Sequence, residues 1–136
     1  MSRALFVDAG AYVAFHIAND QHHKVAKACF EELNKTRRLL ITSTDIVDEA
    51  VTLIEKWANA DLAVEFGETL ARDRRTRIAD IDDAIRKAAW SRFKAFGDKS
   101  FSLTDCTTMA VMKLYRVEEL FTFDQEFRKV GVKVVP

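Results

Sequence analysis

The stretch ALFVDAG, residues 4–10, decides the fold class of this chain, because an apolar run typical of a buried strand ends at a carboxylate followed by small residues. Asp8 is that carboxylate. Three other acids, far apart in the sequence, stand in the same way where an apolar segment meets a turn or the start of a helix: Glu49, Asp105 and Asp124. Strand ends of an open parallel α/β sheet gather at one edge, where ligands bind, so we expect these four side chains to meet there.

Carboxylates gathered at one edge repel one another unless a hard cation with oxygen ligands lies between them. Mg²⁺ and Mn²⁺ are such cations, and phosphodiester hydrolases use them to activate water. The three histidines offer no obvious catalytic base. His22 and His23 have the pattern of a solvent-facing helix start, and His16 stands among apolar residues and is expected to be partly buried. Hydroxide generated by a bound metal ion fits this lack of a histidine base.

Short strands alternate with helices along the whole chain, which predicts a parallel sheet covered by helices on both faces, a three-layer α/β/α sandwich. The expected strands are residues 3–8, 38–42, 76–80, 119–123 and 132–135. The expected helices are residues 10–18, 21–35, 44–58, 60–73, 82–96 and 105–115, with a helical turn from residue 124. A length of 136 residues suits a single domain, residues 1–136.

Each of the four acids also has a purely structural explanation. Asp8 and Asp124 could be helix N-caps, and Asp105 would be stabilised by the dipole of its helix. In the helix at 44–58, Glu49 borders the apolar arc that begins with Ile46.

Other local assignments are expected nearby. Asp20 is the expected cap of the second helix and Thr104 that of the helix at 105–115. Asp98 lies in the expected loop at 97–100.

Composition narrows the class of protein. Hydrophobic residues make up 49% and charged residues 31%, an ordinary composition for a soluble protein. The sequence has no apolar run near the roughly 20 residues that span a bilayer and no evident signal peptide, so we expect a cytoplasmic protein. Lys and Arg together number 21, as do Asp and Glu, which argues against broad, non-specific nucleic-acid binding. Cys29 and Cys106 are expected to be reduced, buried thiols.

The one dense basic cluster, Arg72 to Arg77, is either a solvated helix end or a contact with a phosphate backbone.

Four stretches resemble the PIN domain, specifically the short VapC-like toxins of bacterial toxin–antitoxin pairs. They are LFVDAGAYVAF, ITSTDIVDEAVTLI, DKSFSLTDCTTMAVM and LFTFDQEFRKVGV, in the family's order and over nearly the whole chain. The acid inside LTDC together with FTFD is the most specific part. The resemblance implies the same three-layer fold and selects Glu49 and not Asp48 as the second acid.

The resemblance further implies a metal-dependent endoribonuclease that leaves 3′-hydroxyl and 5′-phosphate ends. Asp8, Glu49, Asp105 and Asp124 would hold one or two Mg²⁺ or Mn²⁺ ions, directly or through water. It also implies a toxin whose small antitoxin, from the same operon, blocks the cleft, and a homodimer formed by residues 44–73.

That segment carries more apolar residues than one sheet-facing arc needs, namely Trp57, Leu62, Val64, Phe66 and Leu70. They form either the dimer contact or part of the monomer core.

Two other functions remain open. The first is a PIN fold that binds RNA or protein without cutting. The second is a phosphotransfer receiver domain, which would need an adjacent acidic pair near the first strand and a late lysine. Neither feature is evident, since Val7 and Ala9 flank Asp8.

Overall fold

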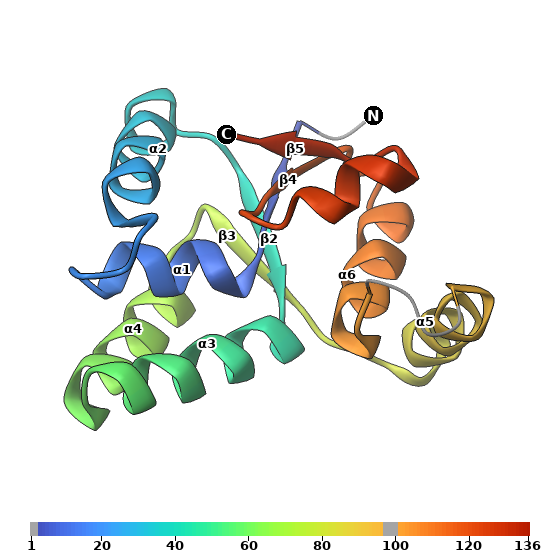
Figure 1. Cartoon of the computed structure of the whole chain (residues 1–136), viewed down its shortest axis with the longest axis horizontal. Coiled ribbons are helices and arrows are strands. Elements are labelled where there is room, and N and C mark those ends of the chain that lie inside the picture. Colours follow the sequence, from blue (N-terminus) through green and yellow to red (C-terminus); the bar gives the residue numbers. More distant parts are fainter. Residues whose placement is uncertain (1–2, 97–100) are drawn as a thin grey trace.

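The computed structural model describes residues 3–96 and 101–136. Its five strands form one sheet in the order β3-β2-β1-β4-β5, and every neighbouring pair is parallel. The strands are β1 (Leu5–Val7), β2 (Leu40–Ser43), β3 (Thr76–Ala79), β4 (Glu119–Phe121) and β5 (Lys133–Val135). All five strands therefore start at one edge of the sheet and end at the other (Figure 1).

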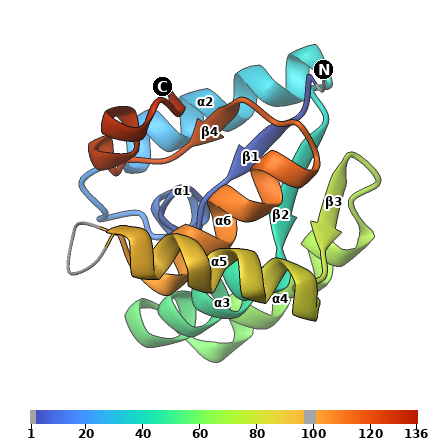
Figure 2. The ribbon, with the colours of Figure 1, turned by 90° about the vertical axis from the view of Figure 1, so that its right-hand side faces the viewer.

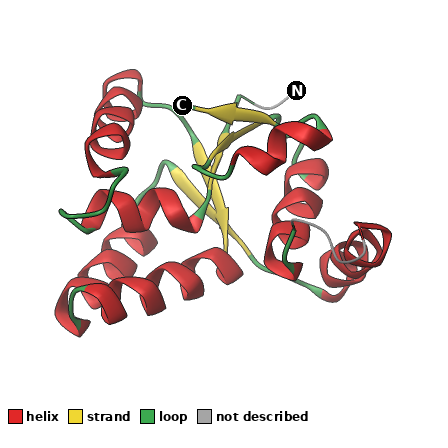
Figure 3. Ribbon diagram, in the orientation of Figure 1, coloured by secondary structure: helices red, strands yellow, loops and turns green. Residues whose placement is uncertain are grey.

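Helices cover both faces of the sheet, as the sequence predicts (Figures 1 and 3). The first group is α1 (Ala9–His16), α2 (His23–Thr36), α3 (Thr44–Trp57) and α4 (Ala60–Arg72). The second group is α5 (Asp83–Phe96), α6 (Leu103–Leu114) and the 3₁₀ turn η1 (Gln125–Val130). Figure 2 shows α5 and α6 in front of the sheet, with α5 outermost. The predicted three-layer α/β/α sandwich is confirmed.

The central strands explain why the sheet forms. All three residues of β1 are buried, and its neighbours β2 and β4 are buried over most of their length. Strands buried on both faces read as continuous apolar runs, which is the pattern of the opening stretch. Leu5 pairs with Leu40 on one side and with Glu119 on the other. This register brings the residues that follow β1, β2 and β4 to the same edge.

Two predicted helix starts are wrong. Helix α6 begins at Leu103 and not at 105, because Ser102 is its N-cap. The Ser102 hydroxyl accepts a hydrogen bond from the Asp105 N–H at 3.0 Å, and the Asp105 carboxylate accepts one from the Ser102 N–H at 2.9 Å. This capping box makes Thr104 an ordinary residue of the first turn. Helix α2 begins at His23, and Asp20 accepts from the His22 N–H at 2.8 Å without capping the helix. Asp98 lies outside the described residues.

The apolar residues of α3 and α4 divide between core and surface. Phe66 and Leu70 are buried, so these two belong to the monomer core and not to a dimer contact. Trp57 and Val64 remain 64% and 57% exposed. Both cysteines are free thiols, with Cys106 buried as expected and Cys29 half-buried. Within the described residues, no helix combines the length and the apolar character needed to cross a membrane.

Candidate active site

Asp8 lies at the end of β1 and is held by three hydrogen bonds. Its backbone N–H donates to the Phe121 carbonyl at 3.0 Å. Its carboxylate accepts the Ala9 N–H at 2.9 Å, as the N-cap of α1, and the Thr122 hydroxyl at 2.8 Å. Asp8 therefore both caps α1 and stands at the end of β1. Burial raises the pKa of Asp8 to about 6, against the lowering effect of the Thr122 and Ala9 hydrogen bonds and with a further rise from Asp105 and Glu49.

Glu49 and Asp105 approach Asp8 from helices of the two different layers, α3 and α6. Desolvation raises the pKa of Glu49, and the charge of Asp105 raises it further, although the residue lies at an exposed rim. Burial also raises the pKa of Asp105, opposed by hydrogen bonds with Ser102, and nearby Asp124 adds to the rise. These mutual effects show that the structure brings the four predicted acids into one electrostatically coupled set.

Asp124 follows β4 and caps the 3₁₀ turn η1, accepting the Glu126 N–H at 3.0 Å. Its own N–H donates to the Thr122 hydroxyl oxygen at 3.1 Å. Thr122 is 2% exposed and therefore connects two of the acids from inside the protein.

The chemistry of this set suits a hard divalent cation. The donors are carboxylate oxygens, and three of the four have a raised pKa, which a neighbouring positive charge would lower. Among the described residues, however, no three His, Cys, Asp or Glu side chains stand as one group that could hold a metal ion as they are. Direct ligation by several of the acids would therefore require side-chain rotation, and ligation through water would not.

A stacked aromatic pair lies beside the acids. The imidazole of His22 stacks on the ring of Phe123, with centroids 4.2 Å apart and planes 3° from parallel. Phe123 directly precedes Asp124, so the pair flanks the site. The sequence predicted only a solvent-facing His22. The aromatic residue between Thr122 and Asp124 was the one available signal for this feature.

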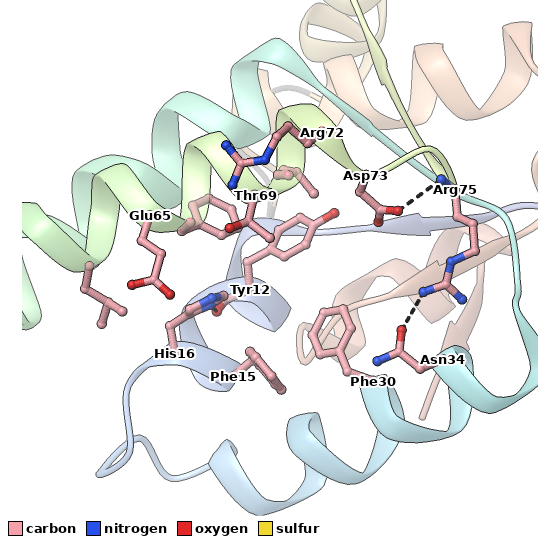
Figure 4. A pocket seen from close by; sticks show the side chains of 13 residues that line it. Tyr12, Phe15, His16, Phe30, Asn34, Glu65, Thr69, Arg72, Asp73 and Arg75 are labelled. Carbon is pink, nitrogen blue, oxygen red and sulfur yellow. Dashed lines mark hydrogen bonds between the residues drawn. The ribbon is translucent and has the colours of Figure 1, made fainter.

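A cavity of about 600 Å³ lies elsewhere and has none of the four acids in its lining. It is formed by α1, α2 and α4, with aromatic walls that include Tyr12, Phe15 and Phe30 (Figure 4). Two hydrogen bonds close its rim: Arg75 donates to Asn34 at 2.6 Å from its side chain and to Asp73 at 3.0 Å from its backbone. Among the described residues, the buried Tyr12 hydroxyl has no hydrogen-bond partner.

The arginine cluster lies at the other end of the strands. Arg74 and Arg75 form the turn before β3, and Arg77 is its second residue, paired with Ile41 of β2. The acids follow strand ends, whereas these arginines accompany strand starts, so the sheet separates the two groups. Any contact of this cluster with phosphate is therefore remote from the acids.

An open parallel sheet with coupled carboxylates at its carboxyl edge defines an α/β protein of the kind that binds ligands at its strand ends. The chain belongs to the PIN domain family, whose profile matches residues 5–133. It is 24% identical over 133 residues to the 23S rRNA-specific endonuclease VapC20 of Mycobacterium tuberculosis, covering 97% of this chain and 98% of that protein. It is also 24% identical over 132 residues to the VapC ribonuclease of Aquifex aeolicus, covering 95% and 93% of the two chains.

Solved structures agree with this assignment. The crystal structure of Mycobacterium tuberculosis VapC20, described as a sarcin-ricin loop cleaving toxin, matches with a TM-score of 0.83 at 22% identity, over 95% of this chain and 96% of that one. VapBC2 from Rickettsia felis, bound to a promoter DNA fragment, matches with a TM-score of 0.68 at 12% identity, over 97% of both chains. The resemblance to PIN domains and VapC proteins is confirmed.

Proposed function

We propose that this PIN-domain chain is a metal-dependent endoribonuclease and the toxin of a toxin–antitoxin pair. The single observation that carries the proposal is the coupled acidic set around Asp8, whose pKa of about 6 reflects burial beside Asp105 and Glu49. Homology to VapC ribonucleases supports RNA as the substrate class. The products would carry 3′-hydroxyl and 5′-phosphate ends.

Asp8, Glu49, Asp105 and Asp124 are the proposed holders of Mg²⁺ or Mn²⁺. When bound, the ion would lower the pKa of a water molecule and stabilise the charge on the leaving oxygen. Asp8 is the most fixed of the four acids, since Ala9 and Thr122 hold both of its carboxylate oxygens. Asp105 is oriented by the capping box, and Asp124 by the N–H of Glu126. Glu49, at the rim, has the most freedom to follow substrate.

The proposal includes two protein contacts and a location. We expect a small antitoxin partner, because the structural relative VapBC2 is named as a pair of antitoxin and toxin. We expect a homodimer through α3 and α4, where Trp57 and Val64 are exposed. The place of action would be the cytoplasm, where RNA and antitoxin are made.

Product analysis tests the proposal most simply. Purified full-length protein would be incubated with RNA in Mn²⁺, in Mg²⁺ and in EDTA. We expect cuts only with metal, and fragments that a 5′-phosphate-dependent exonuclease degrades. RNA binding without any cutting in either metal would favour the alternative, a non-catalytic PIN-fold binding module.

A further inference from the structure

Beside the start of β1, the starts of β2 and β3 carry a row of arginines on the edge of the sheet opposite the acids. We call this surface the arginine edge and define it by Arg37, Arg38, Arg74, Arg75 and Arg77. Backbone hydrogen bonds hold the three segments together: Leu5 N–H donates to the Leu39 carbonyl at 3.0 Å, and Leu40 N–H to the Arg75 carbonyl at 2.8 Å. Although the formal net charge of the chain is zero, the arginines and the proposed catalytic acids lie at opposite ends of the strands.

Two of these arginines are committed to structure. Arg38 forms an ion pair with Glu119 at 2.8 Å, and Arg75 donates to Asn34 at 2.6 Å. Arg74 and Arg77 are more exposed than these two, and neither forms an ion pair within the described residues. A helix dipole does not explain them either, since α4 ends at Arg72 and they lie in the turn and strand beyond it.

A cavity of about 370 Å³ opens between these two arginines. Its lining includes Leu39, Val117 and Tyr115 as well as Arg74 and Arg77. Leu39 is 60% exposed despite its apolar side chain. The guanidinium of Arg77 lies over the Tyr115 ring, 4.6 Å from its centroid, and donates to the Tyr115 hydroxyl at 3.3 Å. The volume falls within the range of small-ligand pockets, roughly 300–1,000 Å³.

We propose that this cavity binds one nucleotide of single-stranded RNA, with the base against Leu39 and the Arg77–Tyr115 pair and the phosphate on Arg74. The inference rests on the proposed ribonuclease function. Arginine grips phosphate in two places at once, and bases stack on aromatic rings and guanidinium planes. An acidic peptide would match the charge, but it would leave the apolar and aromatic lining without a role.

The site would act on binding and not on bond cleavage. Two residues that line the cavity, Leu40 and Ile41, pair with Leu5 and Phe6, which stand three and two residues before Asp8. At about 3.3 Å per residue, the cavity therefore lies roughly 7–10 Å from Asp8 along the strands. A contact at that distance cannot touch the reacting phosphate. The site would bind a substrate whose length lets it reach both edges of the sheet. Loss of the site should therefore raise KM and leave kcat unchanged.

Salt dependence of RNA binding gives the test. Fluorescence anisotropy of a labelled single-stranded RNA would be measured against KCl in EDTA, where metal-dependent cutting is stopped. The variant is Arg74→Ala/Arg77→Ala, and the matched control is Lys56→Ala/Lys87→Ala, which removes equal charge from exposed positions on α3 and α5. Each lost phosphate contact lowers the slope of log K against log salt by about 0.7 for single strands. Because Arg74 makes the one phosphate contact of the proposed site, we expect a slope smaller by about 0.7 and roughly tenfold weaker binding at low salt.

A second variant separates stacking from charge. Tyr115→Leu keeps every charge, so it should weaken binding several-fold while leaving the salt slope intact. Thermal unfolding would confirm that each variant is folded. A misfolded double variant would be replaced by Arg74→Ala alone, which should give the same change in slope.

A slope equal to that of the lysine control would overturn the site, whether or not the protein still cuts RNA with Mn²⁺. If the same variant instead lost affinity for a poly-glutamate peptide, the arginine edge would bind an acidic protein and the RNA assignment would be wrong. Wild-type protein that neither binds nor cuts RNA would overturn the proposed function together with this inference.

Discussion

Thr122 donates its hydroxyl hydrogen to the Asp8 carboxylate across 2.8 Å, and its oxygen accepts the Asp124 N–H at 3.1 Å. One buried side chain therefore positions two acids that belong to different strand ends. This bond also lowers the pKa of Asp8 against the burial that raises it. Without it, the charged form of Asp8 that a cation needs would be harder to reach.

We expect Thr122→Val to weaken Mn²⁺ binding by about tenfold, because an outer partner of a metal-holding carboxylate is lost. Thr122→Ser should keep most of the affinity. Thr42→Val is the matched control, since the Thr42 hydroxyl is equally buried but donates to the Val7 carbonyl at 3.0 Å and not to an acid. Calorimetric titration with Mn²⁺ measures all three. Equal affinities for the two valine variants would remove Thr122 from the site.

The pKa of Asp8 predicts how metal-free stability depends on pH. Its ordinary value of 3.8 rises to about 6 in the folded protein, so the folded state resists losing this proton. The free energy of unfolding should therefore be highest, as far as Asp8 is concerned, below pH 4 and should fall as pH rises through 6. The loss is at most about 3 kcal/mol, at roughly 1.4 kcal/mol per pKa unit.

Asp8→Asn should remove that loss. In EDTA at pH 8 we expect the variant to be about 1–3 kcal/mol more stable than wild type in urea unfolding, with the difference shrinking toward pH 4. A variant that is less stable than wild type at pH 8 would show that the carboxylate stabilises the fold and is not a strained, desolvated charge.

Glu49 and its neighbour Asp48 provide a matched pair on α3. Both side chains are exposed, and the charge of Asp105 acts on Glu49. We expect Glu49→Gln to lower kcat/KM for RNA cleavage by about 100-fold or more, and Asp48→Asn to change it less than twofold. Equal losses in both variants would indicate a general charge effect instead of a specific role for Glu49.

Association should depend on Trp57. Its indole is 64% exposed near Val64, and such side chains on neighbouring helices are typical of a protein contact. Sedimentation velocity at micromolar concentration should show a homodimer that Trp57→Ala dissociates. Trp90→Ala, which removes a 50% exposed tryptophan from α5, should leave it intact. A monomeric wild type would contradict the dimer proposal.

The fold and the acids were predictable because the same local pattern recurs. An apolar run that ends in an acid marks both a strand and its carboxyl end, so Asp8 and Asp124 could be placed at one edge before any coordinates. Glu49 and Asp105 lie on helices whose starts follow that edge. Because the strands are parallel, their carboxyl ends and the four acids meet at one edge, and no knowledge of distant contacts is needed to expect this.

Other features depend on tertiary contacts that no local pattern reveals. The cap of α6 is an exception, because Ser102 and Asp105 have the three-residue spacing of a capping box, a local pattern that favours Ser102 over Thr104. On α4, Phe66 is buried and Val64 is not, which depends on how the helix is rotated against its neighbours. The sequence left the arginine cluster as either a solvated helix end or a phosphate contact, and the turn before β3 places it at the edge opposite the acids.

The account is tested most directly by RNA cleavage with Mn²⁺ by wild type, Asp8→Asn and Asp105→Asn side by side. Each substitution removes one charge and keeps an oxygen that can accept the capping hydrogen bonds from Ala9 or Ser102, so both variants should fold. We predict cleavage by wild type alone, abolished by EDTA, with both variants inactive. Full activity in either folded variant, or wild-type cleavage that persists in EDTA, would contradict the central claim.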